Sequence, residues 1–269
     1  MRIVKVTTLA AFLASPALAT DATLKNPLAD GETWQDLQFD IMGEAEIADG
    51  SGVFEVDAPY RAHDAATVPI VITQTDPEAN ITSAKIVIDE NPAPLAADMT
   101  FGPAMAPLNM EVRVRVNQYS NVRVIADTDQ GQLMNGRFVK ASGGCSAPAS
   151  KDPELALADM GKMRLKHFES EAKMSVPRRE AQIMIRHPNY SGLQRDQITQ
   201  LFIAALFIDD LAVYQGEELL FRIEGGISIS ENPVFRFEYN DNGADALRVR
   251  ATDTEGNIFE RTMPKGGET

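Results

Sequence analysis

Short runs of alternating polar and apolar residues are the feature of this chain that most constrains its fold. The clearest is Glu111–Val116, where valines at every second position alternate with charged side chains. A period of two puts the valines on one face of a strand and the charges on the other. Similar runs, rich in β-branched residues, recur at 53–56, 67–72, 84–88, 121–125 and 136–139. With turns between them, about seven such strands predict an antiparallel β-sandwich.

The second half of the chain predicts a smaller sandwich of the same kind. Candidate strands lie at 181–187 and 234–239, and two candidate hairpins join 211–214 to 219–223 and 247–250 to 258–261. A short helix is expected after Thr33, which we predict to be its N-cap, and another at Pro153. The predicted fold is therefore mainly β, with two immunoglobulin-like antiparallel β-sandwich domains joined by a cysteine-bearing loop and a short helix.

The first residues have the pattern of a cleavable export signal. Met1–Lys5 carries two basic residues, Val6–Ser15 is apolar, and Ala17-Leu18-Ala19 has small residues at the positions that a signal peptidase reads. The apolar run is shorter than the ~20 residues that span a bilayer. We therefore expect cleavage after Ala19, a periplasmic location and no membrane insertion. The expected domains are 1–19 signal peptide, 20–140 first sandwich with its N-terminal helix, 141–152 loop, 153–178 helical connector and 179–265 second sandwich.

Charge and cysteine content narrow the partners. The chain has a formal net charge of −14, which argues against nucleic acid and anionic membranes as partners. Its single cysteine, Cys145, allows no intramolecular disulfide bond. Cys145 lies among glycine, serine, alanine and proline, which have little surface to bury. We therefore expect a solvent-accessible thiol on a mobile loop, flanked by Gly143, Gly144 and Ser146.

The usual catalytic and metal-binding patterns do not emerge from the sequence. His63, His167 and His187 are far apart and belong to no close cluster of metal-ligating residues. The residues around Cys145 include no general base, and only the fold would bring His187 close to the thiol. The glycine pairs do not have dinucleotide-binding spacing. We expect no metal, no cofactor and no catalytic residue, so the chain is predicted to be a carrier and not an enzyme.

The residues quoted so far resemble a known pair of proteins. The first half, ending in Val139–Cys145, resembles SoxY, a sulfur-substrate carrier whose cysteine lies on a glycine-rich arm. The second half resembles its partner SoxZ, at Ile183–Pro188, Gly225–Ser228 and Asn232–Phe237. The whole chain is similar to fused SoxYZ-like carriers associated with quinoprotein dehydrogenases. The resemblance implies that Cys145 is the attachment residue, with Gly143, Gly144 and Ser146 as the carrier arm.

Two functions follow as expectations. The first is a periplasmic covalent carrier that holds a sulfur-containing or other thiol-reactive intermediate on Cys145, as in thiosulfate oxidation. Its partners would be periplasmic redox enzymes that load and unload the thiol, such as a quinoprotein dehydrogenase or c-type cytochromes. The alternative is an accessory binding module of a quinoprotein dehydrogenase system that carries no covalent cargo.

Overall fold

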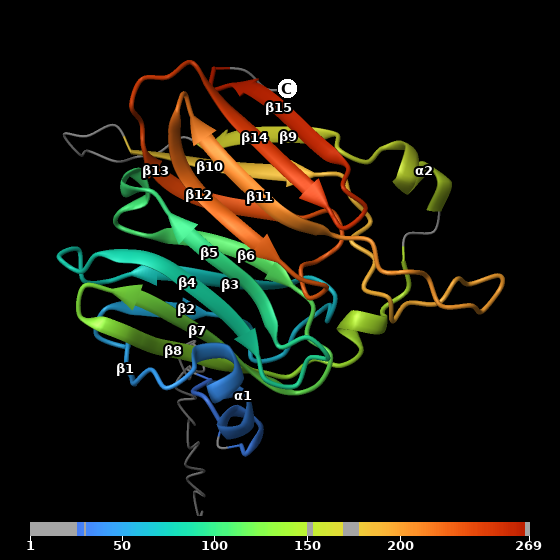
Figure 1. The fold of residues 1–269 in the computed structure, drawn as a ribbon, viewed down its shortest axis with the longest axis horizontal. Helices are drawn as coiled ribbons and strands as arrows, with labels where there is room; N and C mark the ends of the chain where they lie inside the picture. The colour runs from blue at the N-terminus through green and yellow to red at the C-terminus, as the bar shows by residue number, and fades with distance from the viewer. Residues whose placement is uncertain (1–25, 30, 150–152, 169–177, 267–269) are drawn as a thin grey trace, which may run out of the picture.

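The computed structural model describes residues 26–29, 31–149, 153–168 and 178–266 (Figure 1). The signal peptide predicted at 1–19 lies outside the described residues, as do positions 150–152 of the predicted loop and 169–177 of the predicted connector. Among the described residues, no helix combines the length and the apolar character needed to cross a membrane.

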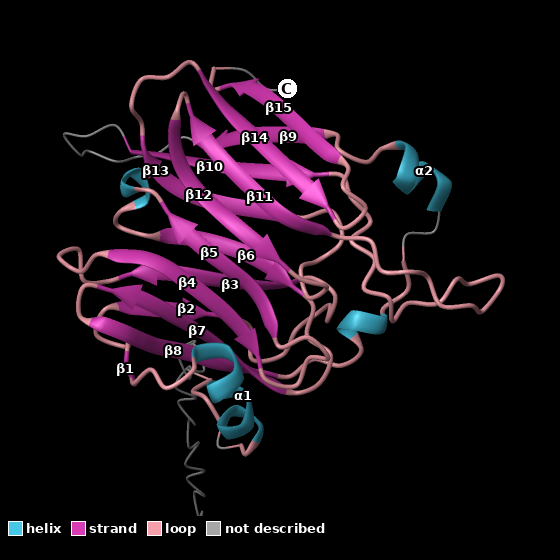
Figure 2. Ribbon diagram, viewed as in Figure 1, coloured by secondary structure: helices cyan, strands magenta, loops and turns pink. Residues whose placement is uncertain are grey.

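Two large sheets contain nearly all of the regular structure (Figure 2). The strand order is β1-β8-β7-β4-β5-β12-β11-β14-β15 in the nine-stranded sheet and β2-β3-β6-β13-β10-β9 in the six-stranded sheet. The strands of the first half are β1 Ile47–Asp49, β2 Phe54–Asp57, β3 Val68–Gln74, β4 Ile81–Ile88, β5 Leu95–Phe101, β6 Asn109–Val114, β7 Ser120–Thr128 and β8 Gly131–Val139. Those of the second half are β9 Met163–Phe168, β10 Arg178–Ile185, β11 Ile208–Gln215, β12 Glu218–Gly225, β13 Val234–Asn240, β14 Ala246–Asp253 and β15 Ile258–Pro264.

Both sheets run without a break from the first half of the chain into the second. In one sheet β5 pairs with β12, and in the other β6 pairs with β13, so that Phe101 lies opposite Phe221 and Val112 opposite Phe235. A single cluster of buried apolar side chains continues through both halves. The prediction of a mainly β fold with two sandwich units is confirmed, and edge-to-edge pairing makes the two units one long sandwich (Figure 1).

Four short helical segments lie outside the sheets: α1 Thr33–Met42, η1 Pro103–Met105, η2 Gly144–Ser146 and α2 Pro153–Ala158. The prediction that Thr33 is the N-cap of α1 is wrong. The N-cap is Glu32, and the Thr33 hydroxyl instead donates to Glu90 Oε1 at 2.6 Å. Trp34 of α1 is buried against the outer side of β4 and β7 through Val87 and Ile125.

The predicted helical connector at 153–178 is only partly helical, because β9 lies within it. Met163 and Leu165 point into the core while Lys162, Arg164 and Lys166 point outward, which is the period of a strand. β9 forms the edge of the six-stranded sheet by pairing with β10. Two further strands, β1 and β5, have no counterpart among the predicted elements, and β1 pairs with β8 in parallel.

Candidate functional site

The loop that carries the cysteine leaves β8 and passes closely over the backbone of the first half. The Gly143 N–H donates to Asn117 O at 2.8 Å and the Gly144 N–H to Val116 O at 3.1 Å. A Cβ atom at Gly144 would lie 2.1 Å from Ala65 O, a distance that no side chain tolerates. Gly143 has φ of +76°, in the left-handed region that glycine adopts at little cost. Gly144 is therefore required by the close passage of two backbones, and Gly143 is favoured by its left-handed φ.

The thiol of Cys145 is enclosed at the end of this passage. Cys145 belongs to η2 and its side chain is 0% exposed. The expectation of a solvent-accessible thiol on a mobile arm is wrong for this structure, because Gly143 and Gly144 fix the backbone and the second half covers the loop. Ser146, the third predicted arm residue, is exposed, and its hydroxyl lies 3.4 Å from Gly143 O. Small residues here serve close packing.

The cover comes from the segment that follows β10. The Ser191 hydroxyl donates to Cys145 O at 2.5 Å, and Gln194 Nε2 donates to Ala147 O at 3.0 Å. Beside these two bonds, Ala149 packs with Tyr190 and Leu206 in a small apolar cluster. We call Ser191 and Gln194 the clamp. Since a hydrogen bond typically contributes about 1 kcal/mol net, the two clamp bonds together contribute about 2 kcal/mol to holding the cysteine loop against the second half.

A buried arginine lies beside the thiol. Arg115, one residue beyond β6, is 1% exposed, and its Nη1 donates to Ile227 O at 3.1 Å and also to Ile229 O. Its Nε–H has no hydrogen-bond partner among the described residues. Burial lowers the pKa of Arg115, whereas the charges of Cys145 and Glu231 act to raise it.

The same pair determines the acidity of the thiol. Burial raises the pKa of Cys145, and the positive charge of Arg115 opposes that rise. At neutral pH the thiol is therefore protonated even more completely than an exposed cysteine, whose pKa is ~8.5. Cys145 also lies outside the three clusters of buried apolar side chains formed by the described residues. The site is a covered thiol in a polar junction, next to a cation with an unused donor.

His187 does not provide the missing base. Its Nδ1 accepts the Asn189 N–H at 3.0 Å, and its Nε2 lies 3.4 Å from Asp253 Oδ2. Burial lowers the pKa of His187, so the ring is neutral at pH 7 and donates from Nε2. His63 is exposed, and both ring nitrogens of His167 lack a partner among the described residues. His187 thus anchors the backbone that leads into the clamp.

Beyond the clamp, the chain projects from the body of the molecule at residues 195–203 (Figure 1). Ile198 is 92% exposed, and Leu201 and Phe202 are also largely exposed. The Arg195 guanidinium lies 4.4 Å from the centre of the Phe202 ring. Ile198, Leu201 and Phe202 make much of the exposed surface of this tip apolar. We call residues 195–203 the projecting loop. Large exposed apolar side chains next to a site are typical of protein–protein contacts.

Sequence reasoning identified Cys145 and missed the residues that surround it. Arg115 was expected among the outward-facing charges of its run, and Ser191 and Gln194 had no motif. One weak signal was available: Tyr190–Gln194 contains a glycine, and that residue, Gly192, has φ of +84° in the tight turn of the clamp. Among the described residues, no group of His, Cys, Asp and Glu side chains is arranged to hold a metal ion.

Two family models match this chain, one ending at Cys145 and the other beginning at residue 169. Residues 39–145 match the family described as "Sulfur oxidation protein SoxY", and residues 169–264 match "Sulphur oxidation protein SoxZ". A solved structure that matches is the "sulfur carrier protein SoxY from Chlorobium limicola f thiosulfatophilum", with 23% sequence identity and a TM-score of 0.34 over 41% of this chain and 97% of that one. Comparison with curated proteins finds no match. The first family match ends at Cys145.

Proposed function

The chain belongs to the sulfur-oxidation carriers, with a SoxY domain followed by a SoxZ domain, and from this membership we propose that it holds a sulfur-containing intermediate on Cys145 in the periplasm. The observation that carries the proposal is the covered thiol beside Arg115, at the junction of the two domains. The export pattern of residues 1–19 supports the location. The partners would be redox enzymes that load and unload the thiol, such as a quinoprotein dehydrogenase or c-type cytochromes.

The chemistry of loading explains the buried cation. When thiosulfate is joined to the thiol, Cys–SH and S₂O₃²⁻ give Cys–S–S–SO₃⁻, one proton and two electrons, and the partner oxidoreductase accepts the electrons. The adduct is an anion in a position where the thiol was neutral. A buried charge needs a partner of opposite sign, and the free Nε–H of Arg115 supplies a charge-assisted hydrogen bond. Arg115 therefore favours an anionic adduct over a neutral one.

Loading also requires that the clamp opens. The two clamp bonds hold the loop to the second half, and both end on backbone oxygens that water satisfies once the clamp is released. We propose that the loading enzyme binds the projecting loop, because this loop continues directly from the clamp and exposes Ile198, Leu201 and Phe202. Covering the thiol between visits protects the adduct from reductants and water.

Intact-mass spectrometry of the protein purified from its native periplasm tests the assignment. We expect an added mass that disappears with a thiol reductant and is absent from Cys145→Ser. A chain that is unmodified in cells using this pathway would contradict the carrier function. Phe202→Ser is the matching test of the projecting loop: loading by the partner enzyme should fall, while reaction with tetrathionate, which needs no partner, should not change.

The burial of Cys145 also favours a second function, an accessory binding module without cargo. In that case the thiol would only fill space at the junction. Tight binding to a dehydrogenase, unchanged in Cys145→Ser and with no adduct in cells, would support this function instead of the carrier.

A further inference from the structure

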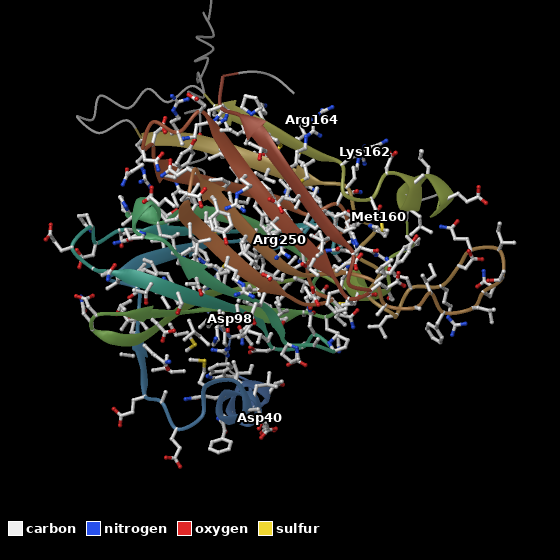
Figure 3. The ribbon with its side chains drawn as sticks, turned by 45° about the horizontal axis from the view of Figure 1, so that its top comes forward. Asp40, Asp98, Met160, Lys162, Arg164 and Arg250 are labelled. Atoms are coloured by element: carbon white, nitrogen blue, oxygen red, sulfur yellow. The ribbon has the colours of Figure 1, made fainter. Side chains whose placement is uncertain are left out.

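A cavity of about 550 Å³ lies at the edge where β9 and β15 meet, and neither Cys145 nor Arg115 nor the clamp residues line it. Its lining includes four basic side chains and one carboxylate, in a chain whose net charge is −14; these are Lys162, Arg164, Arg186, Arg261 and Asp159. Figure 3 shows Lys162 and Arg164 at this edge, with side chains that extend away from the ribbon. A cavity of this size is in the range of small-molecule sites.

The strand register gathers the positive charges onto one face. Met163 pairs with Ile185, so the next position along the ladder puts Lys162 opposite Arg186, whose N–H donates to Lys162 O at 2.8 Å. Arg164 lies two residues further along β9, on the same face as Lys162. Like charges directly opposite each other destabilise a sheet. An anion shared between them removes that cost.

The basic side chains are also poorly paired. Lys162 Nζ contacts Asp159 Oδ1 at 2.5 Å and Arg261 Nη1 donates to Met163 O at 2.7 Å. Arg164 and Arg186 form no ion pair with any residue that the structure describes. Elsewhere in the same sheet the opposite holds: Arg236 contacts Glu180 at 2.5 Å, and Arg113 contacts Glu111 at 3.1 Å. The cavity is therefore a local concentration of available donors.

We propose that this cavity binds a small tetrahedral dianion, of the sulfate or phosphate type, between Arg164 and Arg186. Arginine is suited to this ligand because its planar fork of N–H groups matches two oxygens of an oxyanion at once. Lys162 and Arg261 add positive charge from either side, and the remaining volume holds the water of a partly hydrated ion. The site does not depend on Cys145.

Isothermal titration calorimetry on the mature chain, in a buffer free of oxyanions, tests the site. Sulfate, thiosulfate and phosphate are titrated separately, with chloride for comparison. We expect saturable binding of one ion per chain, weakened about tenfold or more in Arg164→Gln and in Arg186→Gln. The oxyanion that binds most tightly in these titrations shows whether the site prefers a sulfur oxyanion or phosphate. Lys166→Gln is the control, because Lys166 follows on the same face of β9 outside the cavity lining, and it should bind like the unchanged chain.

Two results would overturn the proposal: no saturable binding of any of the three oxyanions, or binding that Lys166→Gln weakens as much as Arg186→Gln does. Binding of oligoglutamate alone would also overturn it, since the ligand would then be an acidic protein segment. Circular dichroism of each variant without ligand checks the fold, and Arg186→Gln should unfold at the same or a higher temperature. Equal oxyanion binding by Cys145→Ser separates this site from the carrier thiol; loss of binding there would contradict it.

Discussion

Two buried arginines in neighbouring parts of this molecule are satisfied in different ways. Arg123, on β7 beneath α1, donates from Nε to Asp89 Oδ1 at 2.9 Å and from Nη2 to Asp89 Oδ2 at 2.9 Å. Its guanidinium also lies 4.6 Å from the centre of the Trp34 ring. Arg115 at the junction has carbonyl acceptors on Nη1 and none on Nε. The first arginine is neutralised inside the fold, and the second keeps part of its positive charge available.

The difference separates a structural charge from a functional one. A buried ion pair is self-contained, so removing one member leaves the other uncompensated. Arg115 donates instead to neutral carbonyls, and the charges that act on it are those of Cys145 and Glu231. On this basis the Arg123–Asp89 pair belongs to the folding of the first half, and under the proposed function Arg115 acts on the loaded thiol.

The largest expected effect comes from breaking the structural pair. Asp89→Ala leaves Arg123 buried without its carboxylate, which typically costs about 3–5 kcal/mol of the free energy of unfolding. Urea denaturation of the two proteins measures this difference. Asp98→Ala, which removes the more exposed carboxylate that contacts Lys85, is the control and should cost about 1 kcal/mol or less. Equal losses in the two variants would remove the distinction between the arginines.

Arg115→Gln should lower the preference of the thiol for a reagent that leaves an anionic adduct. Tetrathionate converts Cys–S⁻ to Cys–S–S–SO₃⁻ and releases thiosulfate, whereas methyl methanethiosulfonate gives a neutral methyl disulfide and releases methanesulfinate. When the two reagents compete for the same protein, the ratio of the two adducts cancels changes in access to Cys145 that affect both reagents. We expect this ratio to fall about 10- to 100-fold in Arg115→Gln, the equivalent of one lost charged hydrogen bond.

The neighbouring arginine provides the control for that ratio. Arg113 is two residues earlier in the chain, is more exposed and contacts Glu111 at 3.1 Å. Arg113→Gln should leave the ratio unchanged. If both variants lower it equally, the effect is that of net charge, and the buried position of Arg115 has no special role.

Opening the clamp is the next largest effect. Ser191→Ala and Gln194→Ala each remove one hydrogen bond to the cysteine loop, and about 1 kcal/mol per bond predicts a roughly 5-fold increase in thiol labelling for each variant. The rate is measured with Ellman's reagent under native conditions. Ser146→Ala is the matched control, because the Ser146 hydroxyl is exposed and contacts only its own loop. A thiol that reacts at the same slow rate in all three variants would exclude the clamp as its cover.

The sequence predicted most of the strands for sound physical reasons, and it misread the surroundings of Cys145 for equally physical ones. Alternation correctly placed Val112 and Val114 in the core, yet the same alternation put Arg115 among outward charges. Arg115 is buried because the chain passes under residues 227–229 just after β6 ends, and no local period records that contact.

The loop glycines illustrate the same limit. A run of small residues indicates either a mobile tether or a passage too narrow for a Cβ atom, and Gly144 is of the second kind. The choice depends on Ser191 and Gln194, which lie 46 and 47 residues away from the groups they hold. The two family matches also leave these contacts undetermined, because each match identifies one domain and not the contacts between the two domains.

The smallest effect is a pH dependence that links the thiol to Arg115. Burial raises the pKa of Cys145 in the folded protein, while the unfolded chain keeps a value of ~8.5. The folded state then binds the thiol proton more tightly, so this contribution to stability is complete below pH ~8.5 and is lost as the pH rises toward the folded pKa.

The free energy of unfolding of the unchanged chain, compared with Cys145→Ser, should therefore be constant near neutrality and decline in the alkaline range. Because Arg115 opposes the rise, Arg115→Gln should extend the decline to higher pH, whereas Arg113→Gln should not. A difference that stays flat to pH 10.5 in the unchanged chain would mean that the thiol is as well solvated in the fold as outside it.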